Sequence, residues 1–325
     1  MKTFQKLVLV LLVLLMSLTG LDAADVKQEG KTQAEQEMEL KEAALQALLS
    51  MKGDQAIPMV EQILKSGKHP RLKEKALFVL TQVDPKKAVP ILTDVALNDK
   101  DPKVREKAVF WLGHAGGEAA IPVLWKIYTG TKDLDIKEKV LFSISQSSSP
   151  EAFNKLKGIV NSETDEKVRA KAVFWLSQRS EKEAGELLKQ VVQNDASLHV
   201  QEKALFALAQ LSEKDGNLAY LLQIAKSHKN DKLREKAVFW LGQTKDAHKQ
   251  MGVLKDFVLN DKNPKIQNNA LMAIAQLPKE YSVKFLAQVA KTHKDMSIRK
   301  KAIFWLGQVG DPEAAKILEE IANEK

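Results

Sequence analysis

The nine residues Val104-Arg-Glu-Lys-Ala-Val-Phe-Trp-Leu112 recur in related form along the whole chain. Close copies occupy residues 72–80, 136–144 and 168–176, and four more are centred on Ala204, Ala237, Ala270 and Ala302. The central small residues are 32 or 33 positions apart, and one further step of 32 backwards reaches Ala44 in a ninth, weaker copy. A fixed period of this length is typical of proteins whose structural units stack on their neighbours.

Within each copy the apolar residues fall on one face of a helix, which we name the A helix. Val104, Ala108, Trp111 and Leu112 are spaced i, i+4, i+7 and i+8, a spacing that indicates an amphipathic helix. An N-cap residue with a side-chain oxygen precedes most copies, and only His69 interrupts this series. The predicted caps are Asp101, Asp133, Asp165, Ser197, Asn230, Asn263 and Asp295.

A second amphipathic run follows each A helix and is named the B helix. Examples are residues 88–97, 119–128, 187–192, 218–225 and 314–322. Pro85, Pro150 and Pro312 mark B-helix starts, where a missing amide costs nothing. Two helices per 32 residues leave only short turns, so neighbours pack antiparallel. The sequence therefore predicts an all-α fold, an α-solenoid of about nine two-helix repeats over residues 38–325, with B helices on its concave side.

The pattern Asp-x-x-Val-Arg-x-x-Ala-x-x-x-Leu-Gly at residues 101–113 resembles the short HEAT-like repeat of the phycobilisome-lyase type. The resemblance covers nearly all of residues 38–325, and tetratricopeptide and ankyrin signatures are absent. It implies a binding scaffold more often than an enzyme. It also implies that the arginine after the first valine, such as Arg105, bridges to the capping aspartate of the adjacent repeat.

The amino-terminal residues are typical of a secretory signal peptide. Lys2 and Lys6 precede an apolar run over residues 7–16, and small residues stand at Ala23 and Ala24. We expect cleavage near Ala23, giving a signal peptide at 1–23, a polar linker at 24–37 and the repeat array at 38–325. Retention as an uncleaved amino-terminal anchor is the alternative. Either way we expect export, and the sequence does not separate periplasm from full secretion.

Composition limits the chemistry that the chain can carry. The sequence contains no cysteine, which excludes disulfides, thiol nucleophiles and cysteine-ligated metal sites. The formal charge is +8, and removing Lys2, Lys6 and Asp22 with the signal peptide lowers it by one to about +7. This charge biases the protein mildly towards anionic partners.

One column of apolar residues departs from the pattern of a solenoid helix, because it stands where polar residues are usual. At ~100° per residue it falls almost opposite the core direction of the A helix. One interpretation is packing under neighbouring lysine and arginine stems. The other is a continuous hydrophobic stripe for an extended or helical partner, and it gives our candidate partner-binding residues: Phe78, Phe110, Phe142, Phe174, Phe206, Phe239, Met272 and Phe304.

Three further columns accompany these residues. A basic column could meet an anionic partner, but a structural or solvated role is the simpler interpretation; it contains Lys73, Arg105, Lys137, Arg169, Arg234 and Arg299, with Lys75, Lys107, Lys139, Lys171, Lys203, Lys236 and Lys301. A glutamine column is expected to bond free carbonyls at the helix ends or a neighbouring turn; it contains Gln82, Gln146, Gln178, Gln210, Gln243, Gln276 and Gln308, with His114 replacing glutamine once. Tryptophan alternates with small residues, at Trp111, Trp175, Trp240 and Trp305, as close packing of bulky against small side chains requires.

Enzyme signatures are absent from the sequence. The six histidines form no local metal motif, and the His-Glu pairs of HEAT-like iron hydroxylases do not occur. Gly-x-Ser-x-Gly and phosphate-binding glycine loops are also missing. We therefore predict an exported, monomeric, non-catalytic scaffold that binds a protein partner, with no cofactor, metal or nucleic acid. The alternatives are a binder of anionic envelope polymer or membrane surface, and a lyase-like or enzyme-accessory protein.

Overall fold

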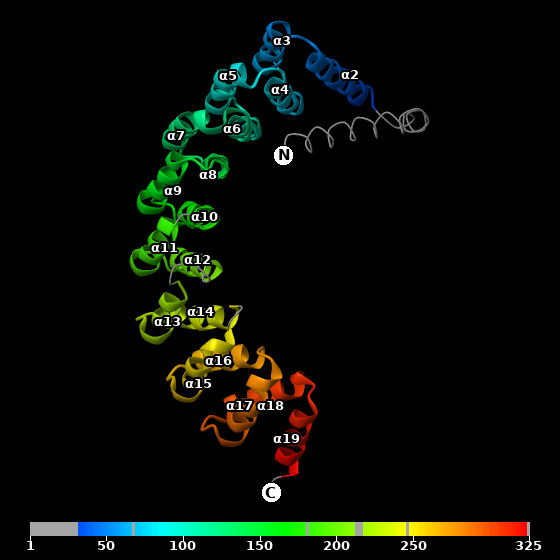
Figure 1. Cartoon of the computed structure of the whole chain (residues 1–325). Coiled ribbons are helices and arrows are strands. Elements are labelled where there is room, and N and C mark those ends of the chain that lie inside the picture. Colours follow the sequence, from blue (N-terminus) through cyan, green and yellow to red (C-terminus); the bar gives the residue numbers. More distant parts are fainter. Residues whose placement is uncertain (1–31, 67–68, 180–181, 212–216, 245–246, 324–325) are drawn as a thin grey trace. The chain divides into compact units, whose positions relative to one another are not determined.

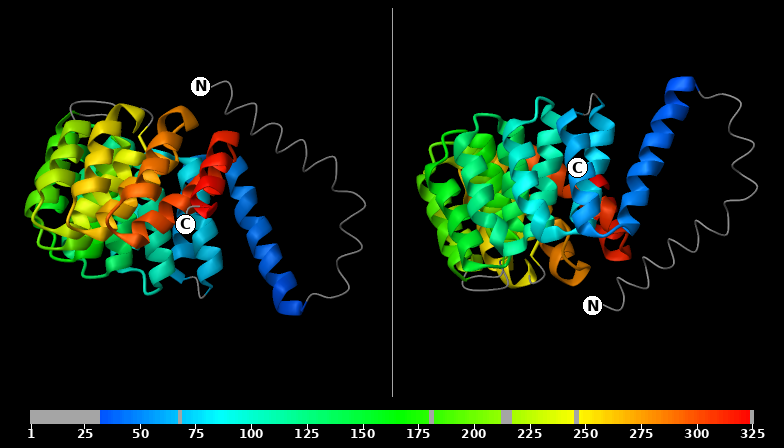
Figure 2. Two further views of the ribbon diagram at one scale, coloured as in Figure 1. Left: turned by 90° about the horizontal axis from the view of Figure 1, so that it is seen from below. Right: turned by 90° about the horizontal axis from the view of Figure 1, so that it is seen from above.

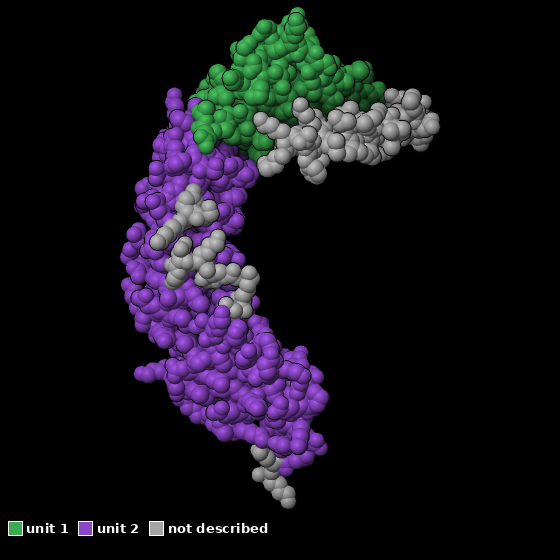
Figure 3. Space-filling view, viewed as in Figure 1, with its two compact units in different colours: residues 1–120 green, residues 121–325 purple. Residues whose placement is uncertain are grey.

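The computed structural model describes residues 32–66, 69–179, 182–211, 217–244 and 247–323, and the regular elements in these ranges are all helices. The chain forms two compact units, residues 1–120 and 121–325 (Figure 3). The expected signal peptide at 1–23 and most of the expected linker lie outside the described residues. The all-α class predicted from the sequence is confirmed for the described chain.

Unit 1 contains α2 (Gln33–Ala47), η2 (Leu48–Ser50), α3 (Gly53–Ser66), α4 (Pro70–Val83), α5 (Pro85–Asn98), α6 (Pro102–Gly116) and η3 (Gly117–Ala120). Unit 2 contains α7 (Ile121–Gly130), α8 (Leu134–Ser145), α9 (Pro150–Ser162), α10 (Glu166–Ser177), α11 (Lys182–Asn194), α12 (Leu198–Gln210), α13 (Asn217–Ser227), α14 (Asp231–Gly242), η4 (Ala247–Gln250), α15 (Met251–Asn260), α16 (Pro264–Ala275), α17 (Lys279–Thr292), α18 (Met296–Val309) and α19 (Pro312–Asn323).

The described helices alternate as the repeat predicts. The A helices are the even-numbered helices from α2 to α18, and the B helices are the odd-numbered helices from α3 to α19, so nine pairs lie in the described chain. The closest packing partner of a B helix is the next A helix, as for α5 and α6, α13 and α14, and α17 and α18. A three-residue turn connects most of these partners, for example residues 99–101. The stacking unit is therefore a B helix with the A helix that follows it.

The predicted caps are confirmed at every position. Each of the seven polar caps accepts a hydrogen bond from a backbone N–H in the first turn of its A helix. Asp165 is representative, because its Oδ1 accepts from the amides of Lys167 at 2.9 Å and Val168 at 3.1 Å. His69 makes no side-chain cap, as expected. Capping fixes where each A helix begins, and through the short turn it fixes the register of the repeat.

The array begins earlier than the sequence indicated. α2 starts at Gln33 rather than at residue 38, because Thr32 and Glu35 form a capping box with reciprocal side-chain-to-backbone bonds. Only Glu42 and Leu45 of this helix are buried. The amino-terminal part of α2 therefore projects from the rest of unit 1 (Figure 2).

Within unit 2 the helices form two layers. The A helices α8 to α18 lie on the inner side of the curve that this unit describes, and the B helices α7 to α15 lie on the outer side (Figure 1). The expectation that B helices line the concave side was therefore wrong for this unit. The physical reason is spacing, because successive A helices pack directly on one another while successive B helices make few contacts.

Small residues bring some A helices especially close together. A Cβ added to Gly242 of α14 would lie 2.4 Å from Ala273 Cβ and 3.1 Å from Ala273 Cα of α16. Gly307 occupies the same helical position in α18, and a Cβ there would meet only Leu318 Cδ1, at 4.0 Å. Glycine is thus required for helix packing at one position and is dispensable at the other.

We expect Gly242→Ala to destabilise the protein by about 1–3 kcal/mol, because the new methyl group must push α14 and α16 apart. Gly307→Ala should instead stabilise it by up to about 1 kcal/mol, because alanine is the better helix former. Urea unfolding followed by circular dichroism measures both variants. Equal effects of the two substitutions would contradict the close approach at Gly242.

Candidate binding face

The turns between B and A helices share a second acceptor that the sequence analysis missed. It lies two residues before each cap and accepts the backbone N–H of the cap residue. The distances are 2.9 Å for Asp101 N to Asp99, 3.1 Å for Asp165 N to Glu163, and 2.8 Å for Ser197 N to Asp195. We name this column the turn acceptors: Asp99, Thr131, Glu163, Asp195, His228, Asp261 and His293.

Four cations of the basic column bond to these turn acceptors: Lys73, Lys137, Arg169 and Arg234. Lys73 Nζ lies 2.7 Å from Asp99 of the next turn. Arg169 holds Asp195 with two bonds of 3.0 Å, and Arg234 pairs with Asp261. Bridging to the adjacent repeat is thus observed for Arg169 and Arg234, but the partner is the turn acceptor and not the capping residue. Arg105, in contrast, donates to the backbone carbonyls of Asp99 and Lys100 in the turn before its own helix. The turn acceptor thus takes both the amide of the cap residue and the cation, as Asp195 does with Ser197 and Arg169.

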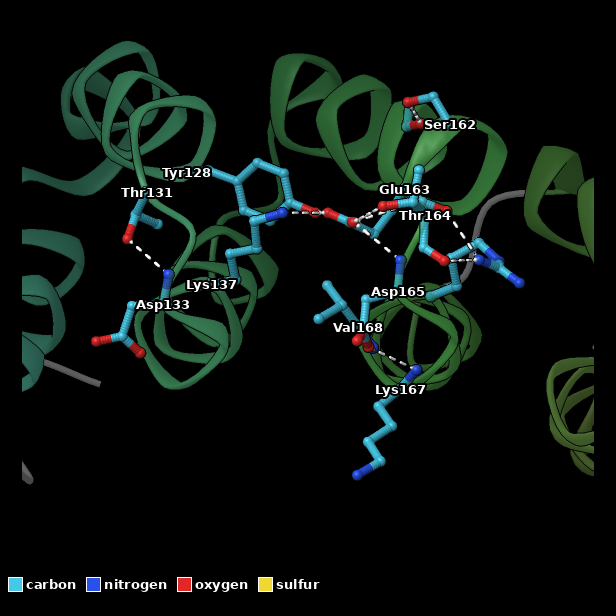
Figure 4. Close-up of polar contacts among 12 residues, drawn as sticks. Tyr128, Thr131, Asp133, Lys137, Ser162, Glu163, Thr164, Asp165, Lys167 and Val168 are labelled. Atoms are coloured by element: carbon cyan, nitrogen blue, oxygen red, sulfur yellow. Dashed lines mark hydrogen bonds and ion pairs between the residues drawn. The ribbon is translucent and has the colours of Figure 1, made fainter.

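The turn at Glu163 shows the most complete network (Figure 4). Its carboxylate accepts bonds from the Tyr128 hydroxyl and from Lys137 Nζ at 2.7 Å, and from the backbone N–H of Asp165. Burial alone would raise the pKa of Glu163, but these bonds outweigh burial and lower the pKa to about 2. Burial and the bond to Glu163 raise the pKa of Tyr128 above its usual range. The network joins α7, α8 and the turn before α10, so its role is structural.

Two histidines substitute for carboxylates among the turn acceptors. Nδ1 of His293 accepts the amide of Asp295 at 3.0 Å, and its Nε2 lies 3.0 Å from the carbonyl oxygen of Val258. His228 Nδ1 likewise accepts the amide of Asn230 at 3.1 Å. Both histidines therefore serve as turn acceptors.

The phenylalanine column lies on the exposed side of the A helices. The exposed fractions are 39% for Phe78, 37% for Phe110, 43% for Phe174 and 57% for Phe304. Phe142, Phe206, Phe239 and Met272 are half-buried. Each side chain of the column is therefore partly covered by the protein and partly exposed to solvent. In unit 2 it follows the inner layer of helices.

Tryptophans support this column from one side. Trp175 of α10 contacts Phe142 of α8 and its own neighbour Phe174, with ring centroids 5.4 and 4.9 Å apart. The same triad occurs as Phe78–Trp111–Phe110 and as Phe206–Trp240–Phe239. The expected alternation of tryptophan therefore pairs the A helices, and each phenylalanine ring in a triad packs on tryptophan.

The glutamine column is exposed, including its substitute His114. Gln146 and Gln178 donate to the hydroxyls of Ser145 and Ser177, at 3.2 and 3.3 Å, and Gln82 donates to Thr81 at 3.4 Å. Gln243 Nε2 bonds Gln276 Oε1 of the next A helix at 2.8 Å. The expectation that these four side chains bond helix-end carbonyls was wrong, because neighbouring hydroxyls and amides accept them instead.

The second part of the basic column borders the phenylalanines. Lys107, Lys139, Lys171, Lys203, Lys236 and Lys301 are exposed, whereas Lys75 is half-buried beside Glu42. Lys171 lies 3.4 Å from Glu138. The exposed face of α8, α10, α12, α14 and α18 thus presents lysine, then phenylalanine, then glutamine, one helical turn apart.

A hollow of about 640 Å³ opens on this face between α10 and α12. Phe174, Phe206, Ala170 and Ala207 form its apolar lining. Its charged lining is Glu138, Lys167, Lys171 and Lys203, with His199. Among the described residues there is no group of three acidic or histidine side chains placed to hold a metal ion. Nor does any described helix have the length and hydrophobicity to cross a membrane.

A profile of HEAT repeats matches residues 57–145, 89–177, 153–242 and 251–325. The chain is a HEAT-repeat protein. The matched segments begin within B helices α3, α5, α9 and α15, so the HEAT repeat has the same frame as the B-then-A stacking unit. A search of curated proteins found no match.

Several solved structures have a similar fold. Kap121p bound to Pho4p has a TM-score of 0.55 and 15% identity, covering 83% of this chain and 35% of Kap121p. Kap121p bound to Ste12p has a TM-score of 0.51 and 15% identity, covering 81% and 34% of the two chains. Human deoxyhypusine hydroxylase with glycerol has a TM-score of 0.36 and 18% identity, covering 74% and 91%. This HEAT-repeat chain therefore spans about a third of Kap121p, and the likeness concerns the fold alone.

We expect Glu163→Gln to lower the free energy of unfolding by about 1–3 kcal/mol at pH 7, because charge-assisted bonds from Lys137 and Tyr128 are lost. Glu163 stays ionised in the folded state down to about pH 2, whereas an unperturbed glutamate titrates near 4.5. Its contribution is therefore present above about pH 4.5 and is lost as the pH falls through about 2. In denaturant titrations, the difference in the free energy of unfolding between variant and wild type should become smaller from pH 5 to pH 2.

Glu151→Gln, on the exposed side of α9, is the control for removing a carboxylate from unit 2. It should leave stability within about 0.5 kcal/mol of wild type. If the stability difference between Glu163→Gln and wild type does not change with pH, the lowered pKa of Glu163 is contradicted.

Proposed function

We propose that this HEAT-repeat protein is an exported, non-catalytic scaffold that holds a protein partner on the exposed face of its A helices. The observation that carries the proposal is the phenylalanine column, in which Phe78, Phe110, Phe174 and Phe304 each leave more than a third of their surface exposed. Scattered single hydrophobic residues need no explanation, but an aligned series at one helical position does. Aromatic side chains that repeat along a groove suit an extended or helical partner.

The comparisons support this class of function. HEAT arrays serve as interaction scaffolds, and Kap121p, whose fold this chain shares in part, is solved with Pho4p and with Ste12p. The face of this chain is suited to the same kind of contact, because apolar rings alternate with polar and cationic side chains. Protein interfaces commonly combine aromatic anchors with a polar rim.

Binding of an anionic envelope polymer or membrane surface is the second candidate. It is favoured by the exposed lysines beside the phenylalanines and by the formal charge of +8. The two candidates differ in their salt dependence, because screening weakens charge pairing and hardly affects apolar burial. Binding that survives high salt favours the protein partner.

The triple variant Phe110→Ser, Phe174→Ser, Phe239→Ser should reduce recovery of the native partner at least about tenfold, because aromatic anchors dominate interface energies. The measurement is a cross-linking pull-down from the extracytoplasmic fraction, quantified by mass spectrometry. Circular dichroism must first show that the variant is folded.

The matched control removes three exposed apolar side chains from B helices, with Met59→Ser, Leu97→Ser and Tyr281→Ser. Their exposed fractions are 47%, 41% and 42%, comparable to those of the column. This control should keep the partner. Unchanged recovery with the column variant, once shown to be folded, would mean that the phenylalanines serve packing alone.

Export rests on Lys2, Lys6, the apolar run at 7–16 and Ala23. We expect protein purified from the extracytoplasmic fraction to begin at Ala24, because small residues at this point fit a cleavage site. Amino-terminal sequencing measures this directly. A chain recovered there with Lys2 and Lys6 still attached would instead indicate an uncleaved anchor.

A further inference from the structure

The A-helix layer of unit 2 alternates between two kinds of junction. Where Trp175 joins α10 to α8, and where Trp240 joins α14 to α12, an indole fills the space between phenylalanines. Between α10 and α12 the equivalent position is Ala207, so no indole stands there. The hollow of about 640 Å³ lies at this junction, with Phe174 on one side and Phe206 on the other.

The position of the hollow follows from where the rings are held. Phe174 packs on Trp175 at 4.9 Å and Phe206 packs on Trp240 at 4.8 Å. Each ring is thus fixed by its own triad. Ala170 and Ala207 of the lining are buried, whereas Phe174 is exposed, so the aromatic rings form the sides of the hollow and the alanines its base. Such a preformed apolar space has the size of a ligand pocket.

The charges around the hollow are unbalanced. Lys167, Lys171 and Lys203 line it, and Glu138 is the carboxylate of the lining. Glu138 is already engaged by Lys171 at 3.4 Å. The lining therefore carries two more positive charges than negative ones, on exposed side chains that can reach an incoming group. Charge complementarity points to an acidic occupant.

We infer that the hollow between α10 and α12 receives an acidic peptide segment, with apolar side chains inserted between Phe174 and Phe206 and carboxylates facing Lys167, Lys171 and Lys203. This inference rests on the proposed function, because it names the chemistry of the partner that the scaffold holds. An apolar anchor alone would leave the lysines unused. A purely charged chain would leave the aromatic walls and the alanine floor uncovered.

The probe is a fluorescein-labelled twelve-residue peptide, rich in glutamate, with a leucine pair at its centre. It is compared with a peptide in which serines replace the leucine pair, and with one in which lysines replace the glutamates. Fluorescence anisotropy with the full chain should show that the leucine peptide binds at least about tenfold more tightly than either, because leucine burial and charge pairing both contribute.

Ala207→Leu should weaken binding of the leucine peptide at least about tenfold, because the larger side chain occupies the space meant for the anchor. The double variant Lys171→Gln, Lys203→Gln should weaken it about threefold to tenfold without filling the hollow. Lys157→Gln, on the exposed side of α9, is the matched control and should leave binding unchanged. Circular dichroism checks that each variant is folded.

Equal binding of the leucine and serine peptides, or undiminished binding by folded Ala207→Leu, overturns the inference and indicates a charge-only surface for a polyanion. Lack of measurable binding by the leucine peptide also overturns it. If one of these negative peptide results occurs but serine substitution of the phenylalanine column still removes the native partner, the scaffold function is supported. Only the proposal of a peptide in the hollow is then refuted. The opposite result is also informative. If the peptide binds as expected but the column variant keeps the native partner, the hollow is supported and the proposed function of the phenylalanine column is refuted.

Discussion

The capped three-residue turn between a B helix and the next A helix, which recurs from α5–α6 to α17–α18, is the constraint on which the rest of the structure depends. One side chain caps the new helix, and another, two residues earlier, holds the amide of the cap itself. Both acceptors satisfy backbone groups that would otherwise be unpaired at a helix end. Because the turn is short and both of its acceptors hold backbone amides, it fixes the angle and register at which the A helix packs.

A cation from the preceding A helix then connects successive turns. Lys73 reaches Asp99, Lys137 reaches Glu163 and Arg169 reaches Asp195, each across one repeat. These side chains are largely buried, so solvent screens the pairs less than ordinary surface pairs. Where glutamine replaces the cation, as at Gln267, its amide bonds the carbonyl of Asp261, and the next turn acceptor is His293 in place of a carboxylate. Carboxylate turn acceptors thus face cations, whereas Arg105, which is followed by the neutral turn acceptor Thr131, bonds the backbone carbonyls of its own turn.

Much of this arrangement could be predicted from the sequence. The helical pairs and caps were predictable because period and N-cap chemistry are local properties of the chain. The turn acceptors were missed because aspartate, threonine, glutamate and histidine share no side-chain class, only the ability to accept one amide. The tryptophan alternation was visible, but its pairing with Phe142 and Phe206 of the preceding repeat depends on how far an indole reaches across the helix layer. The frame of the stacking unit also depends on tertiary packing.

The phenylalanine column raises the question of whether packing alone accounts for it. An aromatic pair adds about 0.5–1.5 kcal/mol beyond its buried area, so contact with tryptophan is a real reason to keep a ring. Met272, however, occupies the same position in α16, and Ala270 and Ile274 of that helix remain buried. A flexible aliphatic side chain is thus compatible with the layer. Packing explains why one side of each ring is covered, whereas phenylalanine at seven of eight positions, with ring surface left in solvent, is better explained by a partner that uses the other side.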